Sequence, residues 1–166
     1  MHRCIEDFRN AGMKVWMLTG DKGLTAEQIG ISCGIIPANA KKDTEGQPAT
    51  LFEVEDTRNV DLLKKSLHDC FEFFGKVELP KLKISGSTMA RALETTDLRE
   101  LVIKIATMAH SVILYRSSPA QKADMVNLIK NNDKGMKTLA IGDGANDVNM
   151  IIQAHIGVGI LSKEGN

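Results

Sequence analysis

Residues 138–148 read TLAIGDGANDV, a short apolar run that is followed by two glycines and two aspartates. An apolar run of this length between polar segments is typical of a strand. The glycines allow tight backbone geometry where the strand ends. The stretch therefore predicts a strand that turns into a helix ending near Ala154, with Asp143 and Asp147 at the turn.

Two further apolar runs end in polar clusters in the same way. Residues 15–18, VWML, are followed by Thr19-Gly20-Asp21, and residues 112–115, VILY, are followed by Arg116. Both runs are typical of strands that are buried on both faces of a parallel sheet. In such sheets the carboxyl ends of the strands meet at one edge, where ligands bind. The three clusters are therefore expected to converge.

The rest of the chain alternates helices with strands, which predicts an α/β domain with a mostly parallel sheet. Helix-ending glycines are expected at Gly12 and Gly34, and Thr25 has capping-box spacing with Gln28. Residues 38–60 are polar and mixed, and we interpret them as a surface insertion or loop. The other expected elements are helices at about 59–74, 87–94, 97–109 and 118–131, and strands at 82–85 and 156–160. The apolar face of the helix at 59–74 is expected to contain Val60, Leu63, Leu67 and Phe71.

Composition narrows the class of protein. The 166 residues suit one compact domain, 1–166. Lys plus Arg and Asp plus Glu both number 21, so the formal net charge is zero and nothing in the sequence resembles a basic nucleic-acid surface. No apolar run approaches the roughly 18 residues of a membrane span. The three cysteines fit no zinc motif and are interpreted as reduced thiols in a cytosolic setting.

The pair Asp143 and Asp147 suits magnesium, which takes oxygen ligands and keeps several waters. An isolated Asp-Gly pair is more often a turn aspartate, and a later aspartate a helix cap. Here the motif spans 142–147 and follows an apolar strand. We therefore predict that both aspartates serve a magnesium site.

Lys122 lies in the opening turn of a helix that Ser118 and Gln121 are expected to cap. The helix dipole disfavours a cation there by roughly 0.3–1 kcal/mol unless an anion compensates. Helix amino termini favour phosphate, and Arg116 is close enough in sequence to join the same site. The alternative is a solvated surface lysine.

The tripeptide Thr19-Gly20-Asp21 offers a hydroxyl and backbone amides that can hold a phosphate oxygen. Its alternative is a simple turn in which Asp21 caps the next helix. Taken with the other two clusters, it favours a phosphate site.

These residues resemble the motifs of the haloacid-dehalogenase superfamily and, more narrowly, of P-type ATPases. Thr19-Gly20-Asp21 matches the second motif. Arg116, Pro119 and Lys122 match the third, and 142–147 matches the fourth. The segments 14–22 and 140–148 are similar to the phospholipid-flippase (P4) branch. The fold that this resemblance implies is a haloacid-dehalogenase-like Rossmannoid three-layer sandwich.

The resemblance implies a cycle in which ATP phosphorylates an aspartate with the help of Mg²⁺, and hydrolysis of the aspartyl phosphate drives lipid movement. By position, Asp143 would bind magnesium, with Asp147 at or beside the ion. Lys122 would neutralise charge on the transferred phosphoryl group. The remaining implied contacts to phosphoryl or nucleotide come from Thr19, Gly20, Asp21, Arg116 and Asn146.

The resemblance also places the chain in a larger protein. The parent would be an integral membrane protein whose phospholipid substrate is handled by membrane helices outside this chain. The present domain would face the cytoplasm. Flippases commonly have an accessory subunit, so such a partner is implied as well.

Two departures from the family pattern matter. The phosphorylatable aspartate belongs to an Asp-Lys-Thr-Gly-Thr sequence that this chain lacks, so we expect a fragment that is inactive alone. In the superfamily the missing strand lies between those ending at Thr19 and Gly142. These strands must then pair directly, accept another segment, or borrow one by self-association. The second departure is Ser85-Gly86, where flippases commonly have Asp-Gly.

Two other functions remain open. A soluble haloacid-dehalogenase-type phosphatase would also need the missing aspartate. A non-catalytic P-type-like regulatory module fused to another activity would keep the same clusters, and the upstream sequence would decide. Trp16 and Met17 are expected in the core, and His110 and His155 as partly buried residues rather than metal ligands.

Overall fold

The computed structural model describes residues 2–41, 49–132 and 135–161. The chain forms two compact units, Met1–Arg116 and Ser117–Asn166, and each is described by itself. The assignment of 1–166 to one functional domain stays a prediction.

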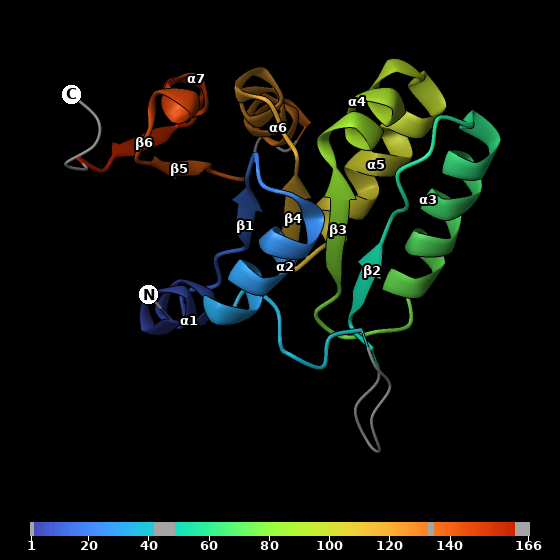
Figure 1. Ribbon diagram of the computed structural model, residues 1–166, viewed down its shortest axis with the longest axis horizontal. Coiled ribbons are helices and arrows are strands. Elements are labelled where there is room, and N and C mark those ends of the chain that lie inside the picture. Colours follow the sequence, from blue (N-terminus) through green and yellow to red (C-terminus); the bar gives the residue numbers. More distant parts are fainter. Residues whose placement is uncertain (1, 42–48, 133–134, 162–166) are drawn as a thin grey trace. The chain divides into compact units, whose positions relative to one another are not determined.

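The first unit is built around a four-stranded parallel sheet (Figure 1). Its central strand β4 is buried along all five residues, as the sequence predicted. The α/β class with a mostly parallel sheet is confirmed. In spatial order the strands are β1 (Val15–Leu18), β4 (Ser111–Tyr115), β3 (Lys81–Ser85) and β2 (Leu51–Glu53).

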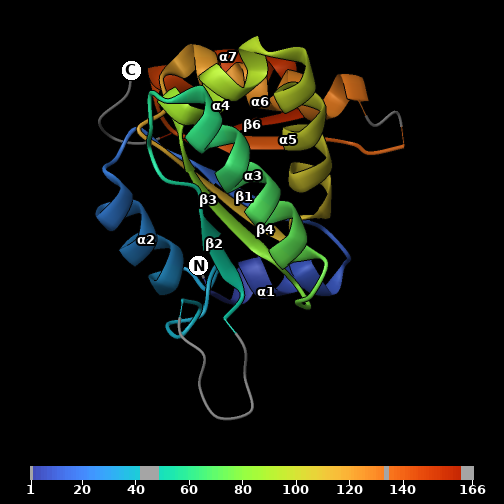
Figure 2. The same ribbon diagram turned by 90° about the vertical axis from the view of Figure 1, so that its right-hand side faces the viewer.

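Helices cover both faces of this sheet. Figure 2 shows α2 on one side of the strands and α5 on the other, with α3 and α4 packed against α5. A Cβ atom at Gly30 would lie 2.9 Å from Cδ1 of Ile113, so glycine lets α2 approach β4 closely. The helices are α1 (His2–Asn10), α2 (Gly23–Ser32), α3 (Val60–Phe74), α4 (Gly86–Glu94) and α5 (Thr96–Met108).

Glycine signals placed the helix ends correctly, whereas one cap prediction is wrong. Gly12 and Gly34 follow α1 and α2 with φ angles of 79° and 76°, the left-handed region that ends helices. Thr25 does not cap α2, because that helix begins two residues earlier at Gly23 with Lys22 as its N-cap.

Three predictions about local burial and structure need correction. Residues 51–53, expected within the insertion 38–60, form β2 beside β3, while 42–48 lie outside the described residues. Strand β1, with Trp16 and Met17, is only half-buried, because it is an edge strand with one neighbour among the described strands. On α3 the buried face includes Cys70 and Phe74. Val60 and Phe71, expected on that face, are exposed.

The second unit contains two parallel strands and two packed helices. Helix α6 packs against α7, and β5 pairs with β6. The predicted strands and helices are confirmed here, but all four residues of β6 are exposed. The elements are α6 (Pro119–Asn132), β5 (Leu139–Gly142), the short 3₁₀ helix η1 (Ala145–Asp147), α7 (Val148–Gln153) and β6 (Ile156–Gly159).

The two strands that would flank the missing family strand, β1 and β5, belong to different units, and each has a partner strand within its own unit. Within the described part of the chain, β1 is hydrogen-bonded to β4, and β5 to β6. Each of the two strands thus keeps one edge without a described partner strand. The three expected solutions for the missing strand stay predictions.

Candidate phosphoryl-transfer site

A buried ion pair joins two of the predicted site residues in the second unit. Lys122 on α6 is 9% exposed, and its Nζ lies 2.8 Å from Oδ1 of Asp147. Both side chains are largely shielded from water, at 11% and 14% exposure. Lys122 is therefore not the solvated surface lysine of the alternative interpretation, and it meets the aspartate motif as expected.

The start of α6 explains the position of Lys122. The amide of Ser118 donates to Oε1 of Gln121 at 2.9 Å, and the amide of Gln121 donates to Oγ of Ser118 at 3.2 Å. This is the predicted capping box, with both orphan donors satisfied. The amide of Lys122 donates to the carbonyl of Ser118, which fixes it in the first turn.

The end of β5 places the aspartates. A Cβ atom at Gly142 would lie 2.3 Å from Cβ of Asp147, so a side chain there would displace that aspartate. Glycine at 142 is therefore required for the Lys122–Asp147 pair. Asp143 and Asn146 lie exposed in the same turn.

The donor set of this turn fits a weakly held magnesium ion. Asp143 presents an exposed carboxylate, and magnesium typically uses one or two protein carboxylates and several waters. Asp147 has one carboxylate oxygen committed to Lys122. Within 2–41, 49–132 and 135–161, no group of three acidic, histidine or cysteine side chains could hold a metal by itself.

The other predicted residues meet in the first unit, at the carboxyl ends of β1 and β4. The hydroxyl of Thr19 donates to Oδ2 of Asp21 at 2.8 Å, and the amide of Asp21 donates back to that hydroxyl at 3.1 Å. The amide of Arg116 donates to the carbonyl of Asp21 at 2.9 Å. Asp21 therefore does not cap α2. It closes a turn that Arg116 joins, with Gly20 exposed between Thr19 and Asp21.

Arg116 has a strained backbone. Its φ angle is 50°, in the left-handed region that residues other than glycine rarely adopt. Such outliers persist where the surrounding structure enforces them, and they cluster at functional sites. The strain is therefore consistent with the role predicted for this strand end.

Sequence reasoning missed a carboxylate at the end of β3. Asp56 accepts hydrogen bonds from Thr88 at 2.8 Å, Ser87 at 3.1 Å and Arg91 at 2.7 Å. The bond from Thr88, followed by those from Ser87 and Arg91, lowers the pKa of Asp56. Ser85 caps α4 through the amide of Thr88. Ser85 stands where flippases commonly have an aspartate, but the carboxylate of Asp56 lies nearby. Asp56 belongs to the segment 38–60, whose sequence was interpreted as a surface insertion.

A second missed feature is a buried charge network under the sheet. Lys83, with 2% of its side chain exposed, lies 2.6 Å from Glu27 and 2.9 Å from Glu53. Lys41 lies 2.8 Å from both glutamates. Burial acts to raise the pKa of Glu27, but the hydrogen bonds from Lys41 and Lys83 outweigh it and lower that pKa. The network ties α2, β2 and β3 together below the strand ends.

The histidines and cysteines behave as structural residues, with one difference. The ring Nδ1 of His155 accepts from the amide of Thr138 at 3.1 Å, although His155 is exposed rather than partly buried. Burial raises the pKa of the Cys70 thiol to about 12, which leaves it unreactive. Cys4 and Cys33 form no disulfide with another described residue.

Known proteins with similar sequences cover nearly the whole chain. The probable phospholipid-transporting ATPase DNF3 of Saccharomyces cerevisiae is 42% identical over 97% of it. The phospholipid-transporting ATPase dnf1 of Schizosaccharomyces pombe is 39% identical over 97%, and the probable phospholipid-transporting ATPase 12 of Arabidopsis thaliana is 38% identical over 98%. The chain is therefore a P-type ATPase segment that resembles the phospholipid-transporting branch.

This flippase-like segment matches a small part of each relative. It spans 9% of the Saccharomyces protein, 11% of the Schizosaccharomyces protein and 14% of the Arabidopsis protein. No family model matches the chain. The described helices include none that is long and apolar enough to cross a membrane.

Proposed function

We propose that the chain forms the carboxyl-side part of the phosphorylation domain of a phospholipid-transporting ATPase. The parent would couple ATP hydrolysis, through an aspartyl phosphate, to the movement of a phospholipid. The observation that carries this proposal is the Lys122–Asp147 pair beside Asp143, in the turn that joins β5 to α7. The phosphorylatable aspartate comes from a segment outside this chain.

In this proposal Lys122 neutralises charge on the phosphoryl group. An ammonium group has three donors, and Asp147 uses one of them. The remaining donors can bind phosphoryl oxygens while the ion pair keeps the side chain oriented. Charge stabilisation by a positioned cation is a main source of rate enhancement in phosphoryl transfer.

Asp143 would hold Mg²⁺, with Asp147 beside the ion. Bound magnesium would neutralise phosphate charge and orient the phosphoryl oxygens. In this chain, Asp143 supplies the carboxylate and Asn146 an amide from the same exposed turn. ATP is the proposed substrate of the whole protein.

The turn of the first unit would contact the phosphoryl group or nucleotide from its own strand end. Thr19 would offer its hydroxyl and Gly20 its backbone amide. Asp21 and Arg116 would keep this turn in shape, since they are hydrogen-bonded to each other through the backbone. The spatial relation of this turn to Lys122 belongs to the proposal.

The proposal also covers the surroundings of the chain. The phospholipid would be handled by membrane helices elsewhere in the parent, with this domain on the cytoplasmic side and an accessory subunit as partner. The isolated chain would self-associate through the strand edges of β1 and β5, because unpaired edges are templates for strand addition.

Phosphoenzyme formation tests the proposed function. The longer protein that carries this segment should form an acid-stable, hydroxylamine-sensitive phosphoenzyme from radiolabelled ATP. Lys122→Met should reduce the phosphorylation rate by at least about 100-fold, as loss of a key electrostatic group does. Lys130→Met, on the same helix, is the matched control and should keep the rate. Normal phosphorylation of the Lys122→Met protein would refute the assigned role.

A further inference from the structure

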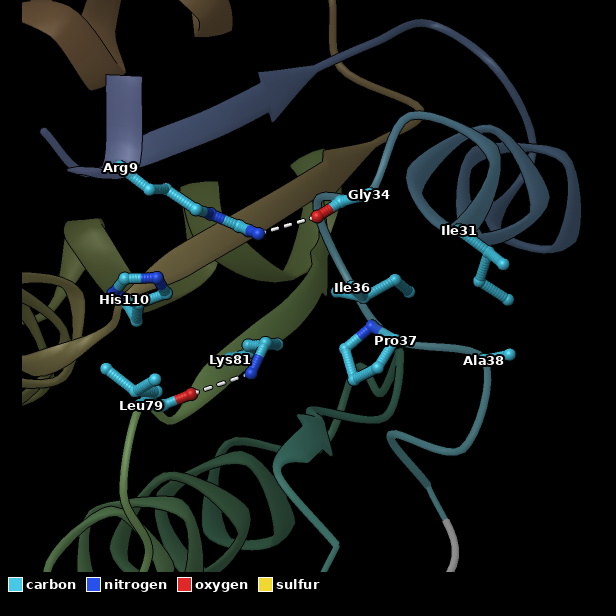
Figure 3. A pocket seen from close by; sticks show the side chains of 9 residues that line it. All are labelled: Arg9, Ile31, Gly34, Ile36, Pro37, Ala38, Leu79, Lys81 and His110. Carbon is cyan, nitrogen blue, oxygen red and sulfur yellow. Dashed lines mark hydrogen bonds between the residues drawn. The ribbon is translucent and has the colours of Figure 1, made fainter. Parts of the chain in front are cut away.

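A cavity of about 480 Å³ lies at the opposite end of the first unit's strands from Thr19 and Arg116. Lys81, the first residue of β3, and His110, which precedes β4, line it together with Arg9 from α1. Figure 3 shows these three basic side chains on one side and Ile36 and Pro37 on the other. The volume is within the roughly 300–1,000 Å³ typical of small-molecule sites.

The charges around this cavity have one sign. Among the described residues that line it, none is acidic. Arg9 donates to the carbonyl of Gly34 at 2.6 Å and to Oγ of Ser111 at 2.9 Å. Its Nε is buried and has no hydrogen-bond partner among the described residues. A buried donor without a partner is unfavourable, so Arg9 retains capacity for an anion.

Lys81 is the most informative residue. It is 6% exposed, and its Nζ donates to the carbonyl of Leu79 at 2.9 Å and to Oγ1 of Thr50 at 3.3 Å. Lys83, two residues later in the same strand, is also buried but contacts two carboxylates. A buried ammonium normally has such a counter-ion. Lys81 has only neutral partners among the described residues.

The mutual effect of these cationic groups agrees with a site for an anion. Burial, and then the charge of Arg9, lowers the pKa of Lys81 to about 8. Burial, followed by Arg9, Lys81 and Lys14, lowers the pKa of His110. Burial lowers the pKa of Arg9, and the charge of Glu6 on the same helix opposes this only in part. A bound anion would relieve the repulsion among the cations.

We propose that this cavity binds a small, soluble phosphate monoester with a compact apolar group. Arg9, Lys81 and His110 hold the phosphate oxygens, and Ile36 and Pro37 contact the apolar part. Within the first unit, the site is separate from Thr19 and Arg116, because it occupies the amino ends of the strands and they follow the carboxyl ends.

Titration of the 166-residue chain with phenyl phosphate, without magnesium, tests the site. NMR should show saturable shifts of the His110 ring, assigned with His110→Gln. Inorganic phosphate should bind more weakly, since it cannot contact Ile36 and Pro37. Lys81→Met should weaken binding roughly tenfold or more, the loss of one charged hydrogen bond. Unchanged binding in that variant, or no His110 shift in the wild type, would overturn the proposal.

Matched variants test whether phenyl phosphate binds in this cavity and not elsewhere on the chain. Lys64→Gln, an exposed lysine on α3, should bind phenyl phosphate like the wild type. Lys122→Met should also retain the His110 shift, and its loss would mean that the ester occupies the phosphoryl-transfer residues instead. If Lys81→Met does not fold, His110→Gln provides the second test by calorimetry and should weaken binding several-fold.

A phosphate monoester could also be presented by a lipid headgroup. Co-sedimentation with phosphatidylcholine vesicles containing phosphatidic acid separates the two sources. Because Lys81 is nearly inaccessible from a flat surface, Lys81→Met should sediment with these vesicles to the same extent as the wild type. Lys81-dependent sedimentation would assign the site to a membrane surface and overturn the soluble ligand.

Discussion

Strands β4 and β6 are both short, apolar and parallel, yet they lie in opposite environments. All five residues of β4 are buried, whereas all four residues of β6 are exposed. β4 has a strand on each side and helices over both faces, whereas β6 pairs with β5 alone among the described strands. The contrast teaches that an apolar run predicts a strand, but burial depends on what the rest of the molecule supplies.

The exposed apolar residues of the second unit form one face of its sheet. Register places Leu139 opposite Ile156 and Ile141 opposite Val158. Each of these four side chains is between 41% and 59% exposed. Because neighbouring strands present paired residues on the same side, they make a continuous apolar surface. An exposed apolar surface of this kind is expected in a segment that matches only a small part of much longer relatives.

The largest expected effect separates the two strands directly. Leu114→Ala in β4 should destabilise the chain by about 2–5 kcal/mol, because it leaves a cavity in a filled core. Ile156→Ala in β6, which is 59% exposed, should change stability by less than about 0.5 kcal/mol. Urea denaturation measures both. Equal losses would mean that the face of β6 is covered, as in a self-associated chain.

The next effect concerns buried charge in the second unit. Asp147→Asn leaves Lys122 without its carboxylate and should destabilise that unit by about 2 kcal/mol, less than the roughly 3–5 kcal/mol for fully buried pairs. Asp124→Asn, an exposed residue on α6, is the control and should be nearly neutral. Amide exchange in α6 and α7 gives the local measurement. Identical exchange in both variants would contradict a structural role for the pair.

In the first unit, Lys81 is buried with only neutral partners among the described residues, and its contribution to stability should depend on pH. The pKa of Lys81 is lowered to about 8 in the folded chain, so between that value and its ordinary pKa the unfolded chain binds more protons. The contribution of Lys81 to stability should therefore rise with pH across this window, by up to about 2 kcal/mol. Lys81→Met should lack this rise. A parallel pH profile for the variant and the wild type would show that Lys81 is not perturbed.

The smallest effect compares helix starts in the two units. Ser118→Ala removes the side-chain acceptor of the capping box and should cost about 1 kcal/mol. Thr25→Ala, inside the first turn of α2, removes no cap and should change stability little. Thermal unfolding of the two variants side by side makes the comparison. A larger loss of stability for Thr25→Ala than for Ser118→Ala would indicate that Thr25 caps α2, contrary to the structure.

The parts of the fold that could be predicted depend on local signals. The run before Arg116, the Ser118 capping box and Gly34 each act within a few residues, so sequence reasoning located them. The strand ends before Thr19 and Asp143 are predicted by the same kind of local signal.

The parts that could not be predicted depend on contacts between distant segments. Strand β2 pairs with β3, although it is only three residues long and lies in a segment of mixed, largely polar sequence. The hydrogen bond from Thr88 to Asp56 and the ion pair between Lys83 and Glu27 form because the tertiary fold brings distant segments together. The exposure of β1 and β6 depends on neighbouring strands that no apolar pattern specifies.

The central claim is that the turn after β5 serves a magnesium-dependent phosphoryl site, and a magnesium titration tests it most directly. NMR of the isolated chain should show weak, saturable Mg²⁺ shifts at Asp143, Gly144 and Asn146. Asp143→Asn should reduce this binding clearly, and Asp124→Asn should not. Superimposable magnesium curves for the wild type and Asp143→Asn would contradict the account.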